Sequence, residues 1–165
     1  MYLKNKIIHF LVFASLYMNI EVCARVFGKD LVGFRGITQY SLMGYTSIYM
    51  GILGGFLALL IAFLCDNDKY FKLKVWQKLL IGGSLITFVE LVSGIILNLW
   101  LKLNIWNYTG KFTFLGQIEL KNCLLWTFII TPLIIWLDSH LTYYIYKEDR
   151  PISLISIYQK LFRLQ

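Results

Sequence analysis

Twenty consecutive residues, Tyr45–Leu64, carry no charged side chain. A helix that crosses the ~30 Å hydrocarbon core of a bilayer needs about 20 residues of this kind. Three further blocks have similar length and apolar content: Ile7–Phe27, Leu79–Trp100 and Ile118–Leu137. The four blocks predict an all-α membrane protein with four transmembrane helices, in a transmembrane domain of residues 1–140.

The composition agrees with this prediction. Of the 165 residues, 58% are hydrophobic and 15% are charged, whereas soluble domains have roughly 45–50% apolar and about 25% charged residues. The excess apolar surface has to face the lipid bilayer, which is the first expected partner. The net charge is +7, but the basic residues lie between the apolar blocks and gather on no single element, so no nucleic acid is expected as a partner.

The distribution of lysine and arginine predicts the orientation. The N-terminus, the loop after the second block and the C-terminal tail together hold ten of them, and the other side holds six. Because cytoplasmic segments are enriched in these residues, both termini of this multi-pass protein are expected in the cytoplasm. A cleaved signal peptide is the rival interpretation of the first block, since Lys4 and Lys6 precede it and Val22-Cys23-Ala24 has small residues at suitable offsets. It would leave three spans with a weaker charge bias.

Residues 141–165 are expected to form a cytoplasmic tail that contains an amphipathic helix. Apolar residues recur on one helical face, and Ser153, Ser156, Gln159, Lys160 and Arg163 lie opposite them. The apolar set is Leu154, Ile155, Tyr158, Leu161 and Phe162. The segment is too short to span, so it is predicted to lie flat on the membrane surface. Docking on a partner protein is an equal alternative.

The chain also contains a weak internal echo. Glu21 in the first span is followed by a loop that ends at Gly44, and Glu90 in the third span by a loop that ends near Gly116. Spans one and three cross in the same direction, so a duplication would give two parallel two-helix repeats. Because side-chain identity between the halves is poor, this remains a hypothesis.

Glu90 is the most informative polar residue. It lies near the middle of an otherwise uncharged span, where a charged carboxylate costs about 2.5 kcal/mol or more. Small or polar residues at Gly83, Thr87, Gly94 and Asn98 share its helical face, so that face is predicted to point into the bundle. The alternative is that Glu90 stays protonated and only ties two helices together.

Glu21 is less diagnostic, because Arg25 follows four residues later at the spacing of an intrahelical ion pair. The alternative is that Arg25 bridges Glu21 and Glu90 in one charged cavity.

Two further features concern helix packing. Small residues at intervals of three or four in the second span, Gly51, Gly55, Ala58 and Ala62, predict close contact with another helix. Pro132 in the fourth span lacks an amide hydrogen and is expected to free the carbonyl of Phe128. The hydroxyl of Thr131 or a water could then satisfy that carbonyl.

The sequence matches no catalytic template. It has no Gly-x-x-x-x-Gly-Lys-Ser/Thr phosphate loop, so the chain is not expected to be an ATPase. His9 and His140 are far apart and lack metal-ligand spacing, and no activated nucleophile is visible. Asp138 falls at the end of the fourth span, where a solvated position is expected. We therefore expect neither an enzyme nor a metal or cofactor site.

Several short stretches resemble the family named putative type IV ABC-transporter permeases, which are small bacterial membrane proteins. They are Phe88-Val89-Glu90-Leu91-Val92-Ser93-Gly94 with Asn98, Trp106-Asn107-Tyr108, Leu115-Gly116-Gln117-Ile118 and Trp136-Leu137-Asp138, together with Glu21, Arg35-Gly36 and Gly44–Met50 in the first half. The resemblance runs from about Asn19 to His140. It departs from the family pattern at Asn107, where an Asp is usual, and at Glu119, where a Cys is usual.

This resemblance implies a bacterial plasma membrane location and a transport role. The first hypothesis is therefore a permease subunit that handles a proton, a cation or a small polar solute at a buried glutamate site. The predicted site residues are Glu90, Glu21, Arg25, Asn98, Trp106, Tyr108 and Gln117. A homo-oligomer or hetero-complex is expected, and a separate ATPase subunit would dock on Cys65–Trp76 and the tail. The second hypothesis is a non-transporting interaction or regulatory protein whose buried glutamates are structural.

Overall fold

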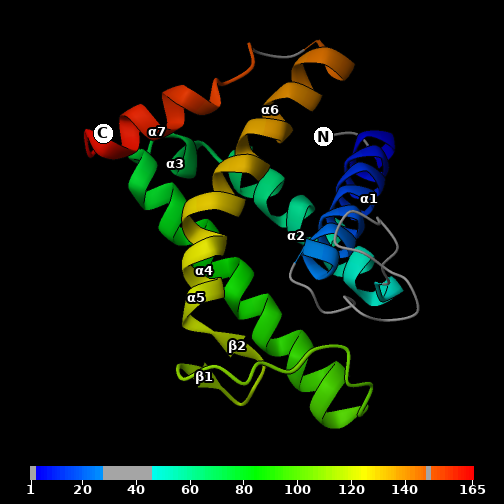
Figure 1. The fold of residues 1–165 in the computed structure, drawn as a ribbon. Helices are drawn as coiled ribbons and strands as arrows, with labels where there is room; N and C mark the ends of the chain where they lie inside the picture. Colours follow the sequence, from blue (N-terminus) through cyan, green and yellow to red (C-terminus); the bar gives the residue numbers. More distant parts are fainter. Residues whose placement is uncertain (1–2, 28–45, 148–149) are drawn as a thin grey trace. The chain divides into compact units, whose positions relative to one another are not determined.

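Four helices of the computed structural model, which describes residues 3–27, 46–147 and 150–165, are long and apolar enough to cross a membrane. They are Lys4–Cys23, Ile48–Cys65, Val75–Trp100 and Leu120–Tyr146. Among the described residues, the sheet is limited to one two-stranded hairpin. The predicted all-α membrane fold with four spans is therefore confirmed (Figure 1).

The chain divides into two compact units, Met1–Leu60 and Ile61–Gln165. The first unit holds α1 (Leu3–Phe27) and most of α2 (Ile48–Cys65). A Cβ atom built on Gly55 would lie 2.6 Å from a ring carbon of Phe10, and one on Gly51 would collide with Met18. The glycines of the predicted small-residue seam thus allow α1 to approach α2 closely.

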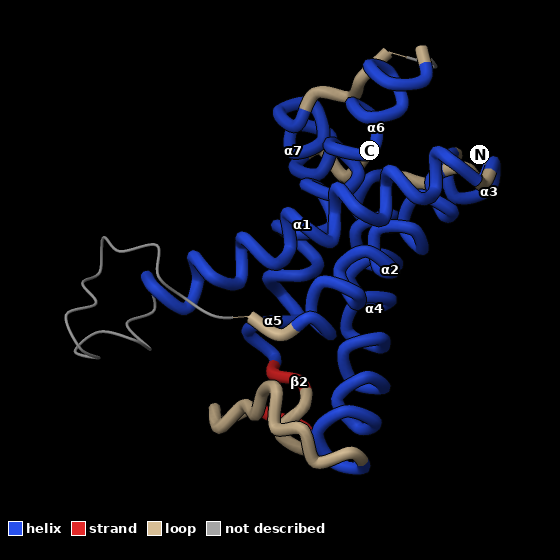
Figure 2. Tube along the Cα trace, turned by 90° about the vertical axis from the view of Figure 1, so that its right-hand side faces the viewer, coloured by secondary structure: helices blue, strands red, loops and turns tan. Residues whose placement is uncertain are grey.

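The second unit contains the remaining elements. The helical ones are α3 (Asp68–Phe71), α4 (Val75–Gly94), η1 (Ile95–Trp100), α5 (Leu120–Leu125), η2 (Trp126–Ile130), α6 (Thr131–Tyr146) and α7 (Leu154–Phe162). Strands β1 (Thr113–Phe114) and β2 (Ile118–Glu119) pair antiparallel, with Thr113 opposite Glu119. Helix α4 packs most extensively on η2 and also contacts α5, α6 and α7 (Figure 2, where the strands are red).

The third and fourth spans begin at residues other than those the apolar blocks predicted. The third helix begins at Val75 rather than Leu79, because the side chain of Gln77 accepts a hydrogen bond from the Lys74 amide at 3.0 Å and caps the first turn. The fourth helix begins at Leu120 rather than Ile118, because Ile118 and Glu119 form β2. It continues to Tyr146, nine residues beyond the predicted end at Leu137.

Glycines bring α4 close to the fourth span and to the β1–β2 turn. A Cβ atom on Gly83 would lie 2.6 Å from the Cα atom of Thr127, and one on Gly94 would lie 2.6 Å from Gln117 Oε1. Both glycines are buried, as the predicted inward stripe on this helix requires. The fully buried Leu79 and Thr131 lie in the core of this unit.

The third and fourth spans each contain a π-helical segment, η1 and η2 respectively. Thr131 at the end of η2 donates its hydroxyl to the carbonyl of Trp126 at 2.8 Å. The sequence had suggested that this hydroxyl could satisfy the carbonyl of Phe128, but it bonds to Trp126 instead. The carbonyl of Phe128 accepts a hydrogen bond from the hydroxyl of Tyr158 on α7, at 2.9 Å.

Candidate functional site

Both carboxylate oxygens of Glu90 are held by aromatic side chains. The hydroxyl of Tyr108 donates to Oε1 at 2.7 Å, and the indole Nε1 of Trp126 donates to Oε2 at 2.7 Å. The two donors lie 18 and 36 residues further along the chain. Glu90, in the third span, is thereby tied to the loop that follows that span and to the fourth span.

Local backbone structure places the two donors. The Tyr108 amide donates to the carbonyl of Gly116 at 2.8 Å, which holds the Tyr108 segment against the β1–β2 turn. Gly116 has φ +68°, a conformation that glycine adopts without strain. A Cβ atom there would also collide with Oδ1 of Asn107. Trp126 is the first residue of η2, which packs on α4.

A second polar cluster is formed around Asn98, which lies eight residues after Glu90 in the third span. Nδ2 of Asn98 donates to Oε1 of Gln117 at 2.8 Å, and Oδ1 of Asn98 accepts from the Ile105 amide at 2.7 Å. The side-chain Nε2 of Gln117 donates to the backbone carbonyl of Leu115 at 3.1 Å. The backbone carbonyl of Gln117 accepts from the indole Nε1 of Trp106 at 3.1 Å. Asn98 is 6% exposed and Gln117 is 2% exposed, so these bonds satisfy groups that water scarcely reaches.

The structure thus brings together five of the seven predicted site residues. Glu90 and Tyr108 form one hydrogen-bonded pair, and Asn98, Gln117 and Trp106 form the neighbouring cluster. The loop joins the two clusters. Tyr108 of the first cluster donates its backbone amide to the carbonyl of Gly116, and Gly116 directly precedes Gln117 of the second cluster.

The other two predicted residues lie in the first unit. Glu21 is half-buried on α1, and its carboxylate accepts a hydrogen bond from the hydroxyl of Thr46. The side chain of Arg25 lies outside the described residues. A cavity shared by Glu21 and Glu90 stays a prediction.

Trp126 is the site residue that the sequence analysis missed. Aromatic residues inside an apolar block usually pack as hydrophobic groups, so an indole gave no sign of bonding to Glu90. A usable signal did exist, because a buried indole N–H requires an acceptor and Glu90 is the one carboxylate in the middle of a predicted span.

Asp138 corrects another expectation. The sequence placed it at a solvated helix end, but its side chain is only 7% exposed. Helix α6 continues for eight residues beyond it, to Tyr146, so Asp138 does not lie at the helix end. It belongs to neither of the two clusters described above.

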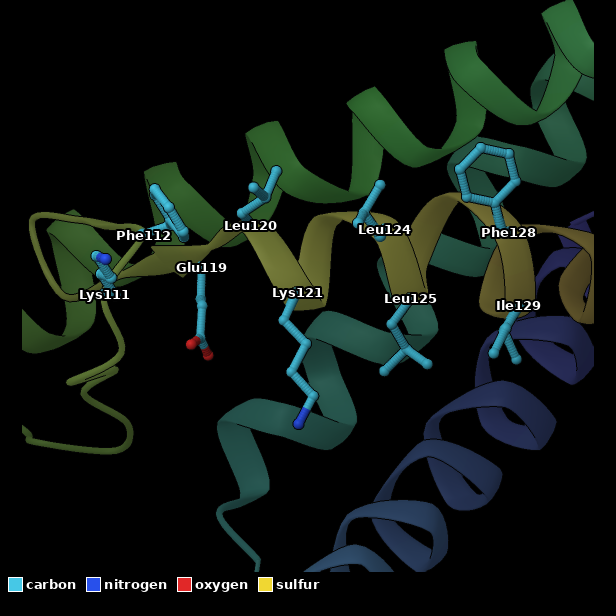
Figure 3. A pocket seen from close by; sticks show the side chains of 9 residues that line it. All are labelled: Lys111, Phe112, Glu119, Leu120, Lys121, Leu124, Leu125, Phe128 and Ile129. Atoms are coloured by element: carbon cyan, nitrogen blue, oxygen red, sulfur yellow. The ribbon is translucent and has the colours of Figure 1, made fainter.

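Two hollows lie in the second unit, and Glu90 lines neither. The larger, about 710 Å³, is an open groove along α5 and η2. Figure 3 shows the leucines of α5 with Phe128 and Ile129 along it, and Lys111, Phe112 and Glu119 at its loop end. The smaller, about 380 Å³, is lined by Ser84, Thr87, Phe88, Leu91, Cys123 and Thr127. The lining of the larger hollow is mainly apolar, as expected of a surface that faces lipid.

The chemistry of the site follows from its donors. Tyr108 supplies an O–H donor and Trp126 an N–H donor, one to each carboxylate oxygen of Glu90. No cluster of three or more His, Cys, Asp or Glu side chains suited to a metal occurs among the described residues.

A family model described as "Putative ABC-transporter type IV" matches residues 8–161. This match spans nearly the whole chain, so the protein belongs to that family. No curated protein and no solved structure gives a significant match. The chain is therefore an ABC-transporter-related protein embedded in a membrane.

Proposed function

We propose that this member of the putative type IV ABC-transporter family is the membrane-embedded permease subunit of a transporter that holds a proton, a cation or a small polar solute at Glu90. The observation that carries the proposal is the pair of hydrogen bonds from Tyr108 and Trp126 to this carboxylate, which we call the carboxylate clamp. A charged group deep in a span is costly, yet here it receives two well-formed donors at 2.7 Å from separate segments.

The clamp supplies a way to open and close the site. Tyr108 lies in a loop, whereas Trp126 lies in η2, the π-helical segment within the fourth span. Movement of either segment removes one donor and makes one carboxylate oxygen available to a solute. Asn98, Trp106 and Gln117 anchor the loop that carries Tyr108. In the closed arrangement the carboxylate is satisfied by the protein itself.

An ATPase subunit would dock on Cys65–Trp76 and the C-terminal tail. The amide of Val75 donates to the carbonyl of Gln165 at 2.7 Å, so the end of the tail lies beside the start of α4. Two segments that are remote in the sequence thus form one surface for a partner. The lysine distribution supports a cytoplasmic location for this surface, where ATP is available, and the family resemblance supports the plasma membrane of a bacterium.

The second candidate function, a structural or regulatory role without transport, is favoured by the same clamp. Both oxygens of Glu90 have partners, so the residue can serve as a tie between the third span, the loop and the fourth span. This role predicts a loss of stability on substitution and no dependence of any solute flux on Glu90.

The replacement Glu90→Gln separates the two candidates, and Glu119→Gln is the matched control. Glu119 is a second glutamate of the unit and lies beside Gly110, outside the Glu90 cluster. The protein is purified together with any ATPase subunit that it binds and is reconstituted into proteoliposomes. Flux is followed with an internal pH dye and with a panel of radioactive monovalent and divalent cations.

We expect ATP-dependent flux with the original chain and with Glu119→Gln, and at least about a tenfold loss with Glu90→Gln, equivalent to ~1.4 kcal/mol. A folded Glu90→Gln protein with undiminished flux would contradict the role of the carboxylate. The absence of any bound ATPase subunit, together with the absence of flux, would favour the structural role.

A further inference from the structure

Helix α7 reaches the fourth span at a backbone carbonyl four residues before Pro132. In an α-helix the carbonyl of Phe128 would accept from the amide of residue 132, and Pro132 has no amide hydrogen. The hydroxyl of Tyr158 donates to this carbonyl at 2.9 Å. This carbonyl thus receives a side-chain donor from a residue 30 positions away.

Tyr158 is held in place by the rest of α7. Its neighbour Ile157 is 5% exposed and packs into the second unit. The end of the tail is fixed by the bond between the Val75 amide and the Gln165 carbonyl. Helix α7 contacts both α4 and α6. The position of the hydroxyl therefore follows the position of the whole helix.

The segment that accepts this bond also carries the donor to Glu90. Trp126 and Phe128 both belong to η2. The indole of Trp126 donates to Glu90 at 2.7 Å, and the carbonyl of Trp126 accepts from the Thr131 hydroxyl at 2.8 Å. In a π-helix each amide bonds to the carbonyl five residues before it, whereas in an α-helix it bonds to the carbonyl four residues before it. A change from one to the other rotates the side chains before it relative to those after it.

We propose that Tyr158 is a positioning residue for the Glu90 site, and that docked α7 holds η2 in the geometry that directs the Trp126 indole at Glu90. Displacement of α7 releases the Phe128 carbonyl, loosens η2 and weakens the bond between Trp126 and Glu90. The tail is thereby a regulatory element of the carboxylate clamp, and its importance for transport rests on the function proposed above.

The test uses Tyr158→Phe, which removes the hydroxyl and keeps the ring. The matched control is Tyr144→Phe, because Tyr144 is a tyrosine of the same unit with 63% exposure. The full chain in lipid nanodiscs is labelled with ¹⁵N-indole tryptophan. Of the five tryptophan signals, that of Trp126 is assigned with Trp126→Phe, and its response to loss of the carboxylate is calibrated with Glu90→Gln.

We expect Tyr158→Phe to shift the Trp126 indole signal in the direction that Glu90→Gln shifts it, while Tyr144→Phe leaves it in place. The signal of Trp106, whose indole bonds to Gln117, should stay unchanged and shows that the fold is intact. Backbone amides of residues 126–131 should exchange about fivefold faster in Tyr158→Phe, as expected for the loss of one neutral hydrogen bond.

An unshifted Trp126 signal with unchanged exchange in Tyr158→Phe overturns the inference. So does an equal shift in Tyr144→Phe. Neither readout measures transport, so the outcome is independent of the flux assay. A Trp126 shift in Tyr158→Phe combined with full flux in Glu90→Gln would leave the coupling standing and contradict only the proposed function.

Discussion

Tyr108 and Trp126 contribute to the Glu90 site through single polar atoms, so their contributions are measurable one at a time. Tyr108→Phe removes one hydroxyl and leaves Oε1 of Glu90 without that donor at 2.7 Å. Leaving a buried polar group without its hydrogen-bond partner costs about 1–3 kcal/mol. We expect a loss of stability of this size in thermal unfolding of the detergent-solubilised protein.

A double-mutant cycle assigns that loss to the pair. In a Glu90→Leu background, Tyr108→Phe should cost less than about 0.5 kcal/mol, because the acceptor is already absent. Trp100→Phe is a control for aromatic replacement at a site that is 75% exposed, and it should change little. Equal losses with and without Glu90 would show that the hydroxyl acts elsewhere.

The sequence indicated the acceptor of this site better than its donors. Glu90 was identifiable because a lone acid inside a span is costly wherever it lies. Asn98 and Gln117 followed from helical periodicity and from family motifs. The bond from Trp126 to Glu90, at 2.7 Å, joins residues that are 36 positions apart. No local pattern encodes such a pairing, since it arises only when α4 packs on η2.

At the scale of elements, close contact between α4 and η2 depends on a glycine. A side chain at Gly83 would meet the backbone of Thr127, because its Cβ atom would lie 2.6 Å from the Thr127 Cα atom. Backbone atoms cannot rotate away as a side chain can. The helices therefore have to separate if this glycine is replaced.

Gly83→Leu tests this dependence, with Ser84→Leu as the neighbouring control at an exposed position. Overpacking costs about 1–3 kcal/mol, so Gly83→Leu should lower the stability by at least this amount in denaturant unfolding. An exposed substitution usually changes stability by less than ~0.5 kcal/mol. If the two variants lose the same stability, the contact between α4 and η2 is not tight at this position.

The spans themselves were predictable, while their ends and their irregular turns were not. Apolar length alone indicated four membrane helices. The start at Leu120 depends on a hairpin that pairs Phe114 with Ile118, which hydropathy does not detect. Pro132 signalled a free carbonyl, but its partner Tyr158 lies on another element. The sequence thus indicated irregular hydrogen bonding near Pro132, and only tertiary packing determined that Tyr158 donates to the carbonyl of Phe128.

At the scale of the whole molecule, an even number of spans predicts that both termini lie on the same side of the membrane. Ten of the sixteen lysines and arginines fall in the segments predicted on that side, and this excess predicts that it is cytoplasmic. The prediction is sensitive to the first span, because a cleaved leader there would leave three spans and put the new N-terminus outside.

Reporter fusions in a bacterial host test the topology. Green fluorescent protein fused separately to the N- and C-terminus should fluoresce in both fusions, because it matures in the cytoplasm, whereas alkaline phosphatase at the C-terminus should be inactive. Intact mass of the C-terminally tagged protein should include residues 1–24. Loss of those residues, or phosphatase activity at the C-terminus, would contradict the four-span topology. Phosphatase activity at the C-terminus would also put the α7 surface on the side without ATP, where no ATPase subunit could bind it, whereas loss of residues 1–24 alone would leave three spans and a cytoplasmic C-terminus.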